Sequence, residues 1–180
     1  MSLIPKDHAL HRWFAGLVES SFQAEIGIAE PTLLEYVTDL LTDFIHVERI
    51  NLVADGRPVE EIAAMLCAAE VNAATSHNER RRTYHRHIGD YTLFWTGVYP
   101  ENLRRLQRRH PGDDLINFFD QGKRSYAIAS ELSTDSSNPA AGVLRQLSEQ
   151  FEYCVYGLGL VRKQWESGED GPGGLKLMLN

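Results

Sequence analysis

Hydrophobic residues recur along this chain at every third or fourth position, with polar residues between them. That spacing is typical of amphipathic α-helices, and no stretch shows the convincing alternation that is typical of a strand. Six segments carry the helical pattern: 6–25, 31–55, a segment opened by Pro58, 77–99, 113–133 and 139–167, with a short basic helix at 101–110. The sequence therefore predicts an all-α fold, a single-domain helical bundle of about six helices.

Residues that favour helix ends mark the borders of these segments. Gly27 ends the first helix, and Pro31 and Pro58 suit the first turns of the second and third. Ser76 and Glu79 form a capping-box pattern, in which each side chain bonds the other residue's backbone N–H. These signals support the helices independently of the apolar pattern.

The helix at 77–99 is expected to be the central one. Its apolar stripe has the spacing four, three, four, three: Tyr84, Ile88, Tyr91, Trp95 and Val98. Further aromatic residues widen this stripe to more than a third of the helical circumference, so other helices should surround it. In the next long helix, Gly122 and Ala129 are small enough to let a neighbouring helix approach closely.

The helix at 139–167 carries apolar residues on two sides. One stripe consists of Val143, Leu147, Cys154, Leu158, Val161 and Trp165, and another side carries Tyr153, Tyr156 and Leu160. Such a helix is either enclosed by other helices or shared with a second subunit. We therefore expect a homodimer, the commonest symmetric assembly.

The bundle is expected to occupy residues 1–166, after which the composition changes. Residues 167–174 are rich in glycine, as a flexible linker is. Leu175, Leu177 and Leu179 follow, and these apolar residues favour docking on the bundle or on a partner chain. Residues 167–180 are thus predicted to form a Gly/Pro-rich linker and an apolar C-terminal tail.

Size and composition indicate a globular protein outside the membrane. A chain of 180 residues can bury about 70% of its surface without disulfide or metal support. Its longest apolar runs, 62–69 and 154–161, are far shorter than a membrane span, and its N-terminus does not resemble a secretory signal. Cys67 and Cys154 lie among apolar residues and are expected to be reduced. We expect a cytoplasmic protein with no membrane partner.

His87 and Asp90 are the strongest candidates for catalytic groups. They lie three residues apart on the central helix, where a buried histidine could contact the carboxylate and act as a general base. Tyr84, Tyr91 and Trp95 would line the resulting pocket, with Glu48 or Glu149 opposite as further ligand-binding candidates. The simpler interpretation, which we favour, is that His87 and Asp90 satisfy each other inside a packed bundle.

Metal and cofactor sites are not expected. A dimetal bundle needs Glu-x-x-His on two helices, whereas this chain offers only Asp43-x-x-His46 and the reversed pair His87-x-x-Asp90. Asp39, Asp43 and His46 also lie opposite the apolar stripe of their helix, towards solvent. Motifs for phosphate-binding loops, dinucleotide binding, zinc proteases and serine hydrolases are absent from the sequence.

Charge is unevenly distributed along the chain. The net charge is −7, yet residues 79–124 hold ten of the eighteen basic residues against six acidic ones, a local charge of +4. Two arginine clusters in this stretch, 80–86 and 104–109, are candidates for weak nucleic-acid binding. Because the rest of the chain is acidic, we regard nucleic acid as an unlikely main partner and pairing within the protein as the better interpretation.

The sequence thus leaves the function open among three classes. The first is a non-catalytic module that binds a protein partner or itself, which fits the two-sided last helix and the missing catalytic motifs. The second is an enzyme or small-molecule-binding protein with a pocket around His87 and Asp90. The third is weak nucleic-acid binding through the arginine clusters. Whether the protein is an enzyme is not decided by the sequence.

Overall fold

The computed structural model describes residues 4–53, 62–74, 78–109 and 111–168, apart from the side chains of 46–53, 72–74 and 111. Eight α-helices lie in these ranges and no strand does, which confirms the all-α prediction with more helices than expected. Contacts divide the chain into two compact units, residues 1–55 with 156–180 and residues 56–155. No described helix is both long and apolar enough to cross a membrane.

The first unit combines the N-terminal helices with most of the last helix. Its elements are α1 (Ala9–Glu19), the π-helical η1 (Ser20–Ile26), α2 (Pro31–Val53) and residues 156–167 of α8 (Phe151–Ser167). Gly27, with φ of 81°, ends η1 at the predicted position, because glycine adopts the left-handed conformation without strain. The core of this unit is fully buried: Phe14, Val18, Phe22, Leu33, Val37 and Leu41.

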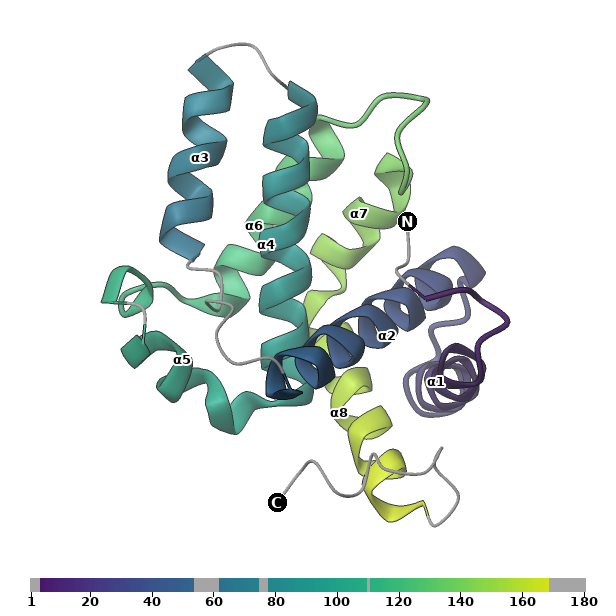
Figure 1. Ribbon diagram of the computed structural model, residues 1–180. Coiled ribbons are helices and arrows are strands. Elements are labelled where there is room, and N and C mark those ends of the chain that lie inside the picture. Colours follow the sequence, from purple (N-terminus) through teal and green to yellow (C-terminus); the bar gives the residue numbers. More distant parts are fainter. Residues whose placement is uncertain (1–3, 54–61, 75–77, 110, 169–180) are drawn as a thin grey trace. The chain divides into compact units, whose positions relative to one another are not determined.

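The second unit is arranged around α4 (Asn78–Val98), as predicted for the central helix. Helix α4 packs against α3 (Ile62–Ala74) and α6 (Phe118–Glu131), and α6 packs against α7 (Ala141–Glu149) (Figure 1). Residues 91–98 of α4 are all buried. The unit also contains the short helices η2 (Pro100–Asn102), α5 (Leu103–Arg109) and η3 (Pro111–Asp113).

Two glycines allow the close helix contacts of this unit. A Cβ atom on Gly122 would lie 2.5 Å from Phe151 Cζ and from Thr92 Oγ1, so the predicted close approach at Gly122 is confirmed. A Cβ atom on Gly89 would lie 2.7 Å from the ring of Tyr126. Both contacts are closer than any larger residue permits, so the spacing of α4 and α6 depends on these glycines.

The helix predicted at 113–133 begins later than expected. Asn117 caps α6 by accepting hydrogen bonds from the backbone N–H groups of Phe119 and Asp120, so the helix begins at Phe118. Leu115, which the apolar repeat at 113–133 would place inside the helix, lies before it and is 96% exposed. Asp113 is buried and accepts hydrogen bonds from the backbone N–H groups that begin α3.

The helix predicted at 139–167 is in fact two helices. Gln150, with φ of −109° and ψ of 23°, leaves the helical conformation and separates α7 from α8. The apolar repeat continues across this break without a proline or glycine, so the pattern alone does not reveal it. The expected start of the third helix at Pro58, the Ser76 cap and nearly all of the predicted tail lie outside the described residues.

Candidate functional site

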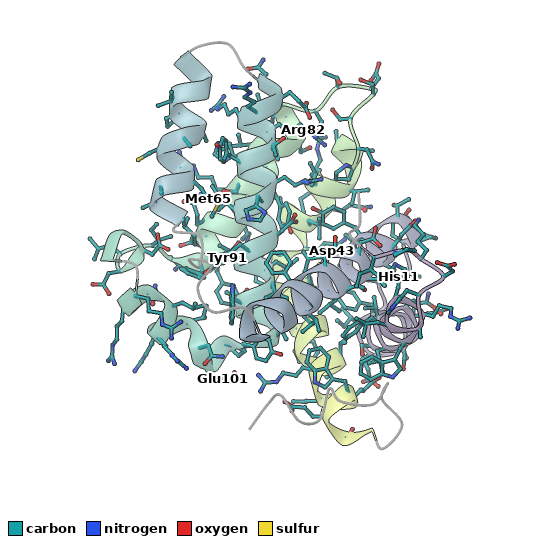
Figure 2. All side chains as sticks on the ribbon, viewed as in Figure 1. His11, Asp43, Met65, Arg82, Tyr91 and Glu101 are labelled. Carbon is teal, nitrogen blue, oxygen red and sulfur yellow. The ribbon has the colours of Figure 1, made fainter. Side chains whose placement is uncertain are left out.

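The predicted pocket residues of α4 lie in packed surroundings. Tyr91 and Trp95 are buried, and their rings contact each other with centroids 6.2 Å apart. Figure 2 shows Tyr91 and Arg82 towards opposite ends of α4. Tyr84, His87 and Asp90 are half-buried. This part of α4 therefore contributes mainly to an aromatic core.

Asp90 has a structural partner on the neighbouring helix. The hydroxyl of the fully buried Tyr126 donates a hydrogen bond of 2.8 Å to Asp90 Oδ1. The ring of Tyr126 reaches this position by lying across Gly89. A carboxylate that ties α4 to α6 in this way has a structural role, through Tyr126 rather than through the predicted contact with His87.

The structure does not place the two remaining predicted ligand-binding residues, Glu48 and Glu149, beside the residues of α4. Glu149 is exposed at the end of α7. The side chain of Glu48 lies outside those that the structure describes, as does that of His46 from the weak metal motif. Among the described residues, no group of three or more histidine, cysteine or acidic side chains is arranged to hold a metal ion.

The buried histidine of α4 is His85, which the sequence analysis did not select. Its side chain is 2% exposed, and neither ring nitrogen has a hydrogen-bond partner among the described residues. Burial, and then the positive charge of Arg81, lower the pKa of His85 from 6.5 to about 4. His85 is therefore a neutral imidazole at pH 7. Gly89, Thr92 and Thr96 lie on the same side of α4 as His85. These small residues were the feature of the sequence from which the burial of that side could have been predicted.

A second histidine–carboxylate pair lies in the first unit. His11 of α1 is buried, and its Nε2 donates a hydrogen bond of 2.8 Å to Oδ1 of Asp39 on α2. Asp39 and Asp43 are half-buried rather than turned fully to solvent as expected. Figure 2 shows His11 and Asp43 on these two helices. The pair joins α1 to α2, which gives it a structural role.

The two arginine clusters differ in their surroundings. In the first cluster, Arg82 is 3% exposed and donates to Ser133 Oγ and to the carbonyl oxygen of Pro139, both at 2.8 Å, and it pairs with Glu79 at 3.2 Å. Arg82 thus connects the start of α4 to the segment that precedes α7 (Figure 2). All four arginines of the second cluster, which lie on α5, are exposed.

Helix α3 has an exposed apolar row besides its buried one. Ile62, Met65 and Ala69 are its buried residues, and Figure 2 shows Met65 on the side towards α4. A second row with the same helical spacing, Ala64, Cys67 and Val71, is exposed, and Val71 reaches 66%. We call these three residues the α3 outer face. Glu70 is the only charged residue of α3, so this helix is apolar on nearly every side.

Comparisons with known proteins give no family for this chain. No family description, curated protein sequence or solved structure matches it. Its function has to be argued from its own residues.

Proposed function

We propose that this chain is a non-catalytic helical module that associates with a second copy of itself through the α3 outer face. The observation that carries the proposal is that α3 is apolar on two sides: the side towards α4 is buried, and the row Ala64, Cys67 and Val71 is exposed among the described residues. Helices that are apolar all round are normally buried on all sides. A second α3 related by a two-fold axis would cover this face, and its small residues permit close approach.

Two other features agree with an intracellular module that binds proteins through its surface. Tyr153 and Tyr156 of α8 are 61% and 59% exposed, as the two-sided pattern of that helix predicted, and they offer a further face for a protein partner. Cys67 and Cys154 are free thiols, which supports the expected cytoplasmic location.

The substitution Val71→Glu tests the proposed interface. In a two-fold dimer it places two carboxylates close together in an apolar contact, so we expect the dimer dissociation constant to rise at least about 100-fold. Because Val71 is exposed, the monomer should keep its fold. Sedimentation equilibrium over a range of protein concentrations measures the change, and circular dichroism checks the fold.

Tyr153→Glu is the matched control, since it adds the same charge at a similarly exposed helical position. It should leave the dimer intact. Cross-linking gives a second readout: a short bis-maleimide should join two chains through exposed Cys67, whereas Cys154 is buried and should not react. A monomeric wild-type protein, or dissociation by Tyr153→Glu but not by Val71→Glu, would show that α3 is not the interface.

A further inference from the structure

Helix α5 presents a row of arginines on one side. Arg104, Arg105, Arg108 and Arg109 are all exposed and fall within about 140° of the helical circumference at 100° per residue. Leu106 is buried on the opposite side, where Gln107 donates a hydrogen bond to the segment that follows η3. The helix is thus fixed to the second unit by one side and offers only arginines on the other.

These four arginines differ from Arg82 in their contacts within the described part of the chain. Among the described residues, none of them makes an ion pair or a hydrogen bond, in contrast to Arg82 with its three partners. An exposed guanidinium group without a protein partner is hydrated by water, so it does not destabilise the fold. It can form two parallel hydrogen bonds with a phosphate or carboxylate group. The free donors therefore indicate a ligand rich in phosphate or carboxylate oxygens.

Two apolar side chains lie in the segment that follows. Leu115 is 96% exposed and Phe119 is 38% exposed. Gln107 Nε2 holds the segment beside α5 with a hydrogen bond of 3.1 Å to the carbonyl oxygen of Ile116, next to Leu115. The ring of Phe119 is oriented by an edge contact with Phe151, with centroids 6.0 Å apart. The arginines and these two apolar side chains are therefore close together in the sequence, and the Gln107 hydrogen bond holds the segment of Leu115 beside α5.

We propose that the α5 surface, consisting of Arg104, Arg105, Arg108, Arg109, Leu115 and Phe119, binds single-stranded nucleic acid. Arginine pairs one turn apart are separated by about 6 Å along α5, which suits successive phosphates of an extended strand. Phe119 offers a stacking surface for an unpaired base, and Leu115 an apolar contact beside it. The proposal concerns a different surface from the α3 outer face and does not depend on self-association.

The acidic net charge does not prevent such binding. At physiological salt the screening length is about 8 Å, so a phosphate on α5 responds mainly to the charges beside it. The exposed carboxylates nearest in the sequence are Glu101, Asp114 and Asp120, and they limit binding to moderate affinity. The same carboxylates disfavour an anionic membrane as the ligand, because inserting Leu115 would carry Asp114 into the headgroup region.

Fluorescence anisotropy with a labelled 12-nucleotide single strand of mixed sequence, as DNA and as RNA, tests the proposal. Four phosphate contacts predict a slope of about −3 for log affinity against log salt, or about 50-fold weaker binding at 200 mM than at 50 mM NaCl. Arg104→Gln/Arg105→Gln/Arg108→Gln/Arg109→Gln should lower affinity at least about tenfold and flatten this slope. Phe119→Leu should lower affinity about tenfold while leaving the slope unchanged.

The control removes the same charge from exposed positions elsewhere: Arg12→Gln/Arg80→Gln/Arg145→Gln/Lys163→Gln. It should change affinity less than threefold, and both four-site variants should melt at the wild-type temperature. The proposal is overturned if neither strand binds at 50 mM NaCl, or if the control weakens binding as much as the α5 variant. It is also overturned if phosphatidylserine vesicles bind the protein and the oligonucleotides do not.

Discussion

At the scale of single residues, His85 is the group whose titration the fold alters most. Burial and the nearby Arg81 lower its pKa to about 4 in the folded protein, whereas an unfolded chain leaves it at 6.5. The unfolded state therefore binds a proton more readily between these two values. The contribution of His85 to stability is complete above pH 6.5 and is lost as the pH falls towards 4.

We expect the free energy of unfolding to decrease by about 1 kcal/mol for each pH unit in that window, up to about 3 kcal/mol in all. His85→Phe should remove this part of the pH dependence, because the new side chain does not titrate. Urea denaturation at pH 7.5, 5.5 and 4.5 measures it for both proteins. Equal pH dependence in the two would contradict the assignment of the shift to His85.

The sequence analysis selected His87, whereas the buried histidine of α4 is His85, two residues earlier. The helical pattern was dominated by large aromatic residues, and His87 falls among them on the helical wheel. His85 lies instead on the side occupied by Gly89 and Thr92, which is buried because α6 approaches closely. Small residues contribute little to an apolar pattern, so a face buried through close approach is easily missed.

At the scale of helices, Gly122 controls how closely α4, α6 and α8 approach. A methyl group at this position would lie 2.5 Å from atoms of Phe151 and Thr92 and would force them to move. We expect Gly122→Ala to lower the free energy of unfolding by about 1–3 kcal/mol, because overpacking outweighs the higher helix propensity of alanine. Thermal or urea denaturation measures the effect.

Gly16→Ala is the matched control for this substitution. Gly16 also lies inside a helix, and a Cβ atom there meets nothing within 4 Å. The same chemical change should therefore raise stability by about 0.5–1 kcal/mol. If both substitutions changed stability in the same direction, close packing at Gly122 would not be the deciding effect.

Helix positions were predictable from local pattern, but contacts across the sequence were not. The apolar repeat located α4 and the glycine signals located the end of η1, because both act within a few residues. Asp113 was placed at the start of a helix, yet its carboxylate accepts hydrogen bonds from Ile62 and Ala63, about fifty residues earlier. Because Asp113 caps α3 from a distant part of the sequence, the residues next to the start of α3 do not predict this cap.

At the scale of the whole molecule, the sequence established the all-α class and the concentration of positive charge in its middle. It did not establish which positive charges are available. The structure separates the two arginine clusters, since Arg82 is buried and hydrogen-bonded while the arginines of α5 are exposed. This distinction depends on which side of each helix is packed, and a count of charges along the chain does not contain it.

Salt should weaken binding at one proposed surface and leave the other almost unchanged. The α3 outer face is uncharged, so raising NaCl from 50 to 500 mM should change the dimer dissociation constant less than about threefold. The α5 surface depends on phosphate contacts, so the same change should weaken oligonucleotide binding by about 1,000-fold. Sedimentation and anisotropy on one protein preparation measure both effects. Because the surfaces use different residues, Val71→Glu should still bind the oligonucleotide as a monomer; if it loses that binding, the two activities share a single assembled site.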